Sequence, residues 1–168
     1  MTSQIDSYRF ISRSTRHIMK SWVKREPARD IPWTPLNKSL DQCTVALISS
    51  AGIALKEDQP FDQEGERQNP WWGDPSFRII PREATEEDVR FYHLHVDTGY
   101  AQEDINCVFP LSLLQQMAKS GEIGQSAPSH YSIMGYLLDE TELLQETAPA
   151  IVDRLLDEEV DIVLLVPV

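Results

Sequence analysis

Residues 44–52 read Thr-Val-Ala-Leu-Ile-Ser-Ser-Ala-Gly, and this stretch decides the fold. Its first five residues form a continuous β-branched and aliphatic run. Such a run is expected of a strand that is buried on both faces of a parallel sheet. A turn should follow at Ala51-Gly52, because glycine interrupts regular structure. We therefore expect residues 44–50 to be the first core strand of the domain.

Strand and helix patterns alternate along the rest of the chain. Apolar runs predict strands at residues 89–96, 129–136 and 160–166, the last of them apolar except for Asp161 and expected to be buried. Pro110 suits the first turn of a helix that stops near Ser120-Gly121. A second amphipathic helix begins around Ala148, with Leu143 and Leu144 in a separate short turn. This order predicts an α/β fold with a mainly parallel, Rossmann-like sheet and flanking helices.

The first 38 residues differ from the remainder in charge. They hold eight Lys/Arg against three Asp/Glu, a charge of 8 − 3 = +5, whereas the other 130 residues carry 7 − 24 = −17, which gives the net charge of −12. Spacings of three and four predict an amphipathic helix over residues 4–25, and three prolines then predict an extended connector. The apolar positions of the helix are Tyr8, Ile11, Thr15, Ile18 and Trp22, and the connector includes Pro27, Pro32, Trp33 and Pro35. We expect a basic N-terminal region, residues 1–38, and an α/β domain, residues 39–168.

Residues 56–81 follow neither strand nor helix periodicity. They contain four prolines and two glycines, and they also contain Trp71, Trp72 and Phe77. Disordered tracts are poor in aromatic residues, whereas long irregular segments inside compact domains are often functional lids. We expect an ordered Pro- and Trp-rich lid over the strand ends.

Composition excludes several classes of function. A net charge of −12 argues against an extended nucleic-acid or anionic-membrane surface. The sequence holds neither an apolar run of about 18 residues nor a secretory signal. Cys43 and Cys107 lie 64 residues apart and form no Cys-x-x-Cys motif. The cytoplasm is the expected compartment, and the basic region could dock on the acidic body or on a partner subunit.

Residues 93–97, His-Leu-His-Val-Asp, carry the densest chemistry in the chain. On a strand, His93 and His95 would share one face, and Asp97 would join them. In parallel α/β sheets the site lies beyond the carboxyl ends of the strands, where Ser49, Ser50 and Gly52 also fall. A His-x-His pair is also common on an ordinary half-exposed strand, so the local pattern leaves both interpretations open.

Cys107 stands shortly before the helix that begins at Pro110. A thiol at a helix N-terminus is favoured as thiolate, yet cysteine is also among the residues most often buried as a small hydrophobe. We expect a supporting role for Cys107, in packing or orientation, and not the role of main nucleophile.

Six motifs, taken in order, resemble the selenoprotein B family of glycine, sarcosine, betaine and D-proline reductases. They are Trp33-Thr34-Pro35-Leu36, Val45-Ala46-Leu47-Ile48-Ser49-Ser50-Ala51-Gly52-Ile53, Gly73-Asp74-Pro75-Ser76-Phe77-Arg78, His95-Val96-Asp97, Glu103-Asp104-Ile105-Asn106-Cys107-Val108-Phe109-Pro110 and His130-Tyr131-Ser132-Ile133-Met134-Gly135-Tyr136. The resemblance covers roughly residues 33–168.

The resemblance implies reductive cleavage of a carbon–nitrogen bond in a small amino-acid-like substrate, with a selenolate or thiolate as the attacking group. It implies other reductase subunits as partners, and a homo-oligomer is open. The family's selenocysteine or Cys follows the strand that here ends at Val166, so we expect it just after Val168, and the 168-residue form would be inactive alone. We expect that the reading frame was ended at a UGA codon that the organism reads as selenocysteine. The alternative is a protein that lacks the nucleophile. No other cofactor is evident.

Candidate catalytic residues are His95, Asp97 and Cys107, with Asp97 fixing the tautomer of His95 and His95 supplying a proton to the leaving amine. Candidate substrate-binding residues are Ser49, Ser50, Gly52 and His130. A second hypothesis is a metal-binding protein or metal-dependent hydrolase that uses His93, His95 and Asp97. In metallo-hydrolases this pattern continues with a further His, where this chain has Thr98. A third hypothesis is a non-catalytic partner subunit.

Overall fold

The computed structural model describes residues 11–25, 30, 32, 34–69 and 71–168, and the chain divides into two compact units, residues 1–35 and 36–168. In the first unit, helix α1 (Arg13–Val23) begins after Ser12, whose Oγ accepts a hydrogen bond from the Thr15 N–H at 3.1 Å. The helix predicted from residue 4 thus begins at Arg13, and residues 1–10, with Pro27 and Trp33, lie outside the described residues.

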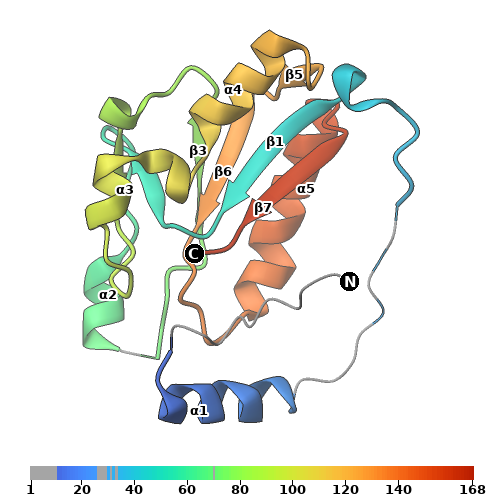
Figure 1. The fold of residues 1–168 in the computed structure, drawn as a ribbon. Helices are drawn as coiled ribbons and strands as arrows, with labels where there is room; N and C mark the ends of the chain where they lie inside the picture. Colours follow the sequence, from blue (N-terminus) through green and yellow to red (C-terminus); the bar gives the residue numbers. More distant parts are fainter. Residues whose placement is uncertain (1–10, 26–29, 31, 33, 70) are drawn as a thin grey trace. The chain divides into compact units, whose positions relative to one another are not determined.

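The second unit is built on a five-stranded mixed sheet (Figure 1). The central strand β1 (Thr44–Ser49) pairs in parallel with β5 (Gln125–Ser126), β6 (Ser129–Ile133) and β7 (Ile162–Val166). The β7 pairing covers Val45 to Ser49, so β5 and β6 share the other side of β1 in succession. Strand β3 (Phe77–Pro81) runs antiparallel to β6. The predicted α/β class and the first core strand are confirmed.

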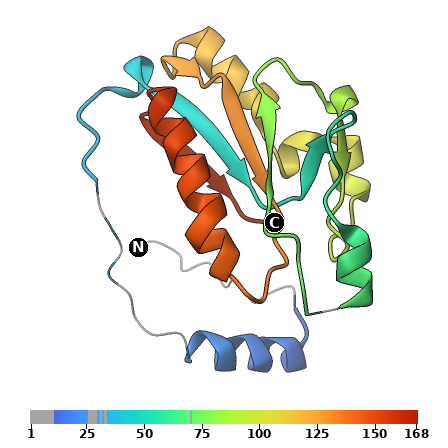
Figure 2. The same ribbon diagram turned by 180° about the vertical axis from the view of Figure 1, so that it is seen from behind.

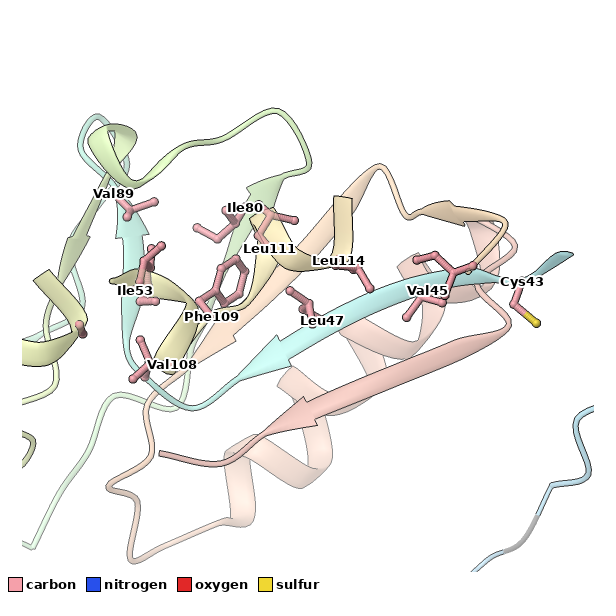
Figure 3. Close-up of a cluster of buried hydrophobic side chains, with 14 residues drawn as sticks. Cys43, Val45, Leu47, Ile53, Ile80, Val89, Val108, Phe109, Leu111 and Leu114 are labelled. Atoms are coloured by element: carbon pink, nitrogen blue, oxygen red, sulfur yellow. The ribbon is translucent and has the colours of Figure 1, made fainter. Parts of the chain in front are cut away.

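Helices cover both faces of this sheet (Figure 2). Val45 and Leu47 of β1 pack in one core with Leu111 and Leu114 of α4 (Leu111–Ser120), as Figure 3 shows. Ala46 packs in a second core with buried residues of α5 (Ala148–Asp157). Alternate side chains of one strand thus enter two cores, which is why residues 44–48 form a continuous apolar run.

The strand predicted at residues 89–96 is wrong in length and in partner. Strand β4 (Val89–Phe91) ends before the histidines and pairs antiparallel with β2 (Ile53–Leu55) in a separate two-stranded sheet. Beyond it, the His95 N–H donates to Nδ1 of His93 at 3.2 Å. This local bond closes a turn in place of a strand ladder, so His93 is buried while His95 is exposed.

The predicted lid has regular structure of its own. It contains α2 (Gln63–Gln68) and strand β3, so its description as a segment without strand or helix is wrong. Helix α2 has only six residues and begins at Asp62, whose Oδ1 accepts the Gly65 N–H at 2.8 Å. Such a short helix rests on its cap and its tertiary contacts, so it leaves no apolar period in the sequence.

Shorter helices complete the second unit. They are η1 (Leu40–Gln42), η2 (Glu86–Asp88), α3 (Gly99–Glu103) and η3 (Ile105–Cys107). A further segment corrects a prediction. Leu143 and Leu144 do not form a separate turn, because the π-helical segment η4 (Leu143–Thr147) runs directly into α5. Pro149 lies in the first turn of α5, where a proline is tolerated.

Strand β7 is less buried than its apolar sequence predicts. It pairs with β1 alone among the described strands, and Leu165 is 67% exposed. The prediction of a fully buried last strand is therefore wrong. No helix within the described residues is long and apolar enough to cross a membrane.

Candidate functional site

The carboxyl ends of β1 and β7 are joined side by side. The Ser50 N–H donates to the Val166 carbonyl at 3.1 Å, and the Val168 N–H donates to Ser50 Oγ at 2.9 Å. The serine that follows the central strand thus holds the residues that follow the neighbouring strand. Both lie at the edge where parallel α/β sheets bind their ligands.

Gly135, just after β6, marks the point where this edge meets residues 92–97, called here the histidine loop. A Cβ built on Gly135 would lie 2.8 Å from the carbonyl oxygens of Ser50 and Val168 and 2.9 Å from Nε2 of His93. Three chain segments therefore converge within the space of one methyl group. Any side chain larger than that of glycine would push them apart.

His93 is buried at this convergence, with 8% of its surface exposed. Its pKa is lowered, first by burial and then by the neighbouring His95. Nδ1 accepts the His95 N–H, so the neutral ring carries its proton on Nε2, which is the atom beside Gly135. His93 thus presents a neutral N–H donor to the edge of the sheet.

His95 faces a different group, the carboxylate of Glu66 in the lid. Its Nε2 lies 2.8 Å from Oε1 of Glu66, and its ring packs against that of Tyr136, with 4.1 Å between centroids and 41° between the ring planes. Glu66 is 3% exposed, whereas the His95 side chain is 48% exposed. A buried acid beside a half-exposed imidazole is an arrangement that can hold and move a proton.

Asp97 and Cys107 lie apart from these contacts. Oδ1 of exposed Asp97 accepts the Gly99 N–H at 3.0 Å within its own turn. Cys107 is exposed at the end of η3, three residues before the Pro110 N-cap of α4. Among the described residues no three His, Cys, Asp or Glu side chains are grouped so that they could hold a metal ion, and this applies to His93, His95 and Asp97.

The remaining candidates are built into the framework. Ser49 is fully buried, and its Oγ donates to the Val108 carbonyl at 2.7 Å. His130 is also fully buried, with Nδ1 accepting the Leu47 N–H at 2.9 Å and Nε2 bonded to Ser126 Oγ at 2.9 Å. Burial lowers the pKa of His130 to about 4, so the ring is neutral at neutral pH.

Gly52 connects the two sheets. Its φ of +61° lies in the left-handed region that glycine adopts without strain. Its N–H donates to the Ile133 carbonyl at 3.0 Å in the main sheet, and its carbonyl accepts the Tyr92 N–H at 2.8 Å. The residue that directly precedes β2 therefore also sets the position of the histidine loop.

Sequence reasoning missed Glu66, Gly135 and Tyr136 as members of the site. Glu66 lies in a helix too short to leave a period, and nothing in its neighbourhood marks it as a buried acid. Gly135 and Tyr136 fall within the last of the six motifs, directly after an expected strand, and that position was the signal that could have identified them.

The chain is thus an α/β domain whose buried histidine His93 lies beside the carboxyl ends of two parallel strands, β1 and β7. The chain belongs to the glycine/sarcosine/betaine reductase selenoprotein B family, whose model matches residues 19–168. This membership confirms the family that the six motifs indicated.

Two curated relatives are similar to this chain. The gamma subunit of D-proline reductase from Acetoanaerobium sticklandii is 39% identical over 133 residues, which are 79% of this chain and 52% of the relative. The gamma subunit of glycine reductase complex component B from Carboxydothermus hydrogenoformans is 29% identical over 110 residues, 65% of this chain and 25% of the relative. The chain thus spans about half the length of the first relative and about a quarter of the second. No solved structure matches it.

Proposed function

We propose that this chain is part of a reductase subunit that cleaves a carbon–nitrogen bond in a small amino-acid-like substrate. Family membership and the two relatives, which are named as subunits of reductases, support the reaction class. One structural observation carries the proposal furthest: the position that a Cβ of residue 135 would take lies 2.8 Å from the Val168 carbonyl oxygen and 2.9 Å from His93 Nε2.

The position directly after Val168 is where the resemblance puts the family's selenocysteine or cysteine. When present, that group would supply a selenolate or thiolate that attacks the substrate carbon and displaces the amine. Ser50 supports this assignment, because its Oγ accepts the Val168 N–H and so fixes the backbone that leads to the position. Ser50 and Gly52 are our candidates for the substrate-facing edge.

His93 suits the orientation of an anion at this position. Its lowered pKa keeps the ring neutral at neutral pH, and its Nε2–H lies on the side of Gly135 and Val168. A neutral N–H donor stabilises an anionic selenium or sulfur atom without protonating it. We therefore add His93 to the candidate catalytic residues.

His95 is our candidate for the group that gives a proton to the leaving amine. It is half-exposed, packs against Tyr136 and has a carboxylate partner at 2.8 Å. That partner is Glu66, so we assign Glu66 the role that the sequence suggested for Asp97. Ser49 and His130, fully buried and hydrogen-bonded, support the strand ends, and Cys107 remains a candidate for orientation.

The test uses the complete gene product in its native complex. The assay measures amine or ammonia release from glycine, sarcosine and betaine, and ring opening of D-proline, from which no amine is released. We expect cleavage of at least one of these substrates and a loss of turnover of 100-fold or more in His93→Leu. His17→Leu, on exposed α1, is the control. No cleavage of any of the four substrates, or full turnover in His93→Leu, would overturn the proposal and favour a non-catalytic partner subunit.

A further inference from the structure

Glu66 is a buried acid whose carboxylate makes no hydrogen bond of regular geometry among the described residues. It is 3% exposed, and its Oε1 lies 2.8 Å from Nε2 of His95. A buried ionised carboxylate is strongly destabilising unless a charge or a proton compensates it. The retention of an acid at this position therefore requires a neighbour that supplies one of the two.

That neighbour is His95. Its Nε2 lies 2.8 Å from Oε1 of Glu66, a contact that is an ion pair only when the imidazole is protonated. The neighbouring acids have other partners: Glu64 in α2 accepts from Gln68, and Asp62 at its N-cap accepts from Gly65. His95 is the group that places a ring nitrogen within 2.8 Å of the buried carboxylate.

Helix α2 is held against the histidine loop by further contacts. Nε2 of Gln63 donates to the Tyr92 carbonyl at 2.6 Å, and Gly65 packs so closely that an added Cβ would lie 2.8 Å from the Trp72 ring. At Gly73 the backbone passes directly against the Tyr136 carbonyl. These contacts of the lid place Glu66 beside the His95 ring, which packs against Tyr136.

We propose that Glu66 is the positioning residue of His95. The carboxylate keeps a proton on Nε2 of His95, so Nδ1 is the ring atom that faces substrate and exchanges protons. The same pair fastens α2 to residues 92–95. The assignment of Nδ1 to proton transfer rests on the proposed function, whereas the tautomer and the fastening of α2 do not.

Imidazole NMR of the ¹⁵N-labelled 168-residue chain tests the tautomer at pH 8, above the ordinary pKa of histidine of about 6.5. We expect Nε2 of His95 to be protonated in the native protein and in Glu66→Gln, which keeps an acceptor. Glu66→Met, which removes the acceptor at similar volume, should give mixed tautomers. Glu64→Met, exposed on the same helix, should have no effect. An unprotonated Nε2 in the native protein, or an unchanged tautomer in Glu66→Met, would overturn the proposal.

Amide hydrogen exchange provides a second measurement that does not depend on the folding of Glu66→Met. In His95→Asn, residues 63–68 should exchange at least tenfold faster than in the native chain, and His17→Asn should leave them unchanged. Equal exchange in His95→Asn would show that the pair does not hold α2. Both experiments can succeed when no reductase turnover is found, so a failure of the proposed function is distinguished from a failure of this inference.

Discussion

The Val168 N–H donates a hydrogen bond to Ser50 Oγ at 2.9 Å, and these two residues are 118 positions apart in sequence. The bond connects the segments that follow the adjacent strands β1 and β7. Ser50 also takes part in the parallel ladder, because its own N–H donates to the Val166 carbonyl at 3.1 Å. One residue therefore holds the end of β7 through both its backbone and its side chain.

Ser50→Ala should loosen the end of β7 without disturbing the core. The hydroxyl accepts the Val168 N–H at 2.9 Å and donates a longer bond, of 3.4 Å, to the Val168 carbonyl oxygen. The loss of the shorter bond costs about 1 kcal/mol, so the free energy of unfolding should fall by at least that amount. Exchange of the Val168 amide should accelerate about fivefold, while the amides of β1 keep their protection. Ser120→Ala, exposed at the end of α4, is the control. Unchanged exchange at Val168 would show that the hydroxyl does not hold the strand end.

Gly135→Ala should destabilise the domain by overpacking. The new methyl group would lie within 2.9 Å of backbone oxygens on two segments and of the His93 ring, and overpacked sites typically cost about 1–3 kcal/mol. Gly99→Ala is the matched control, because its Cβ would meet only the Asp97 side chain, at 3.2 Å or more. Urea unfolding measures both variants, and an equal loss at the two positions would contradict the assigned crowding.

His130 should make the fold sensitive to mild acid. Its pKa is about 4 in the folded chain and about 6.5 in the unfolded chain, so the unfolded state binds the proton more readily between these values. Its contribution to stability is complete above pH 6.5 and is lost as the pH falls through 4. This loss corresponds to about 3 kcal/mol.

The variant His130→Asn isolates that contribution. Its amide oxygen can accept the Leu47 N–H in place of Nδ1 but does not titrate in this range. Unfolding free energies of the native chain should therefore decline more steeply than those of His130→Asn between pH 6.5 and 4. Parallel pH curves for the two proteins would refute the buried neutral histidine.

The two cysteines should differ in access to a thiol reagent. Cys43 has no exposed surface and its Sγ donates to the Ser39 carbonyl at 3.2 Å, whereas Cys107 is exposed. A disulfide reagent such as Ellman's should modify one thiol in the native chain and two in denaturant. Peptide mapping should identify Cys107 as the first, and prompt modification of Cys43 in the native chain would contradict its burial.

Runs of apolar residues and a helix-ending glycine predicted the core well. Short-range hydrogen bonds between side chains and backbone limited the prediction elsewhere. Residues 44–48 and the helix that ends at Gly121 were recognisable because burial on two faces and a left-handed cap leave clear signals. The histidine loop was predicted as a strand because the sequence pattern does not show that Nδ1 of His93 accepts the His95 N–H.

The candidate site was predictable in its place but not in its membership. Parallel strand ends indicated the Ser50 edge, whereas the partner of His95 comes from a helix of six residues that shows no periodicity. The nearest acid in sequence, Asp97, was the natural expectation, yet its carboxylate is taken by the Gly99 N–H. Tertiary placement of a single buried side chain decides such a pairing, and pattern reasoning does not register it.

Gly52 gives the molecule a pivot. Its N–H belongs to the main sheet through Ile133, and its carbonyl belongs to the loop that carries His93 through Tyr92. A small backbone rotation at Gly52 would change the angle between the two sheets and, with it, the separation between His93 and Val168. Substitutions that alter this angle would therefore change the geometry beside Val168 even where they lie far from the histidines.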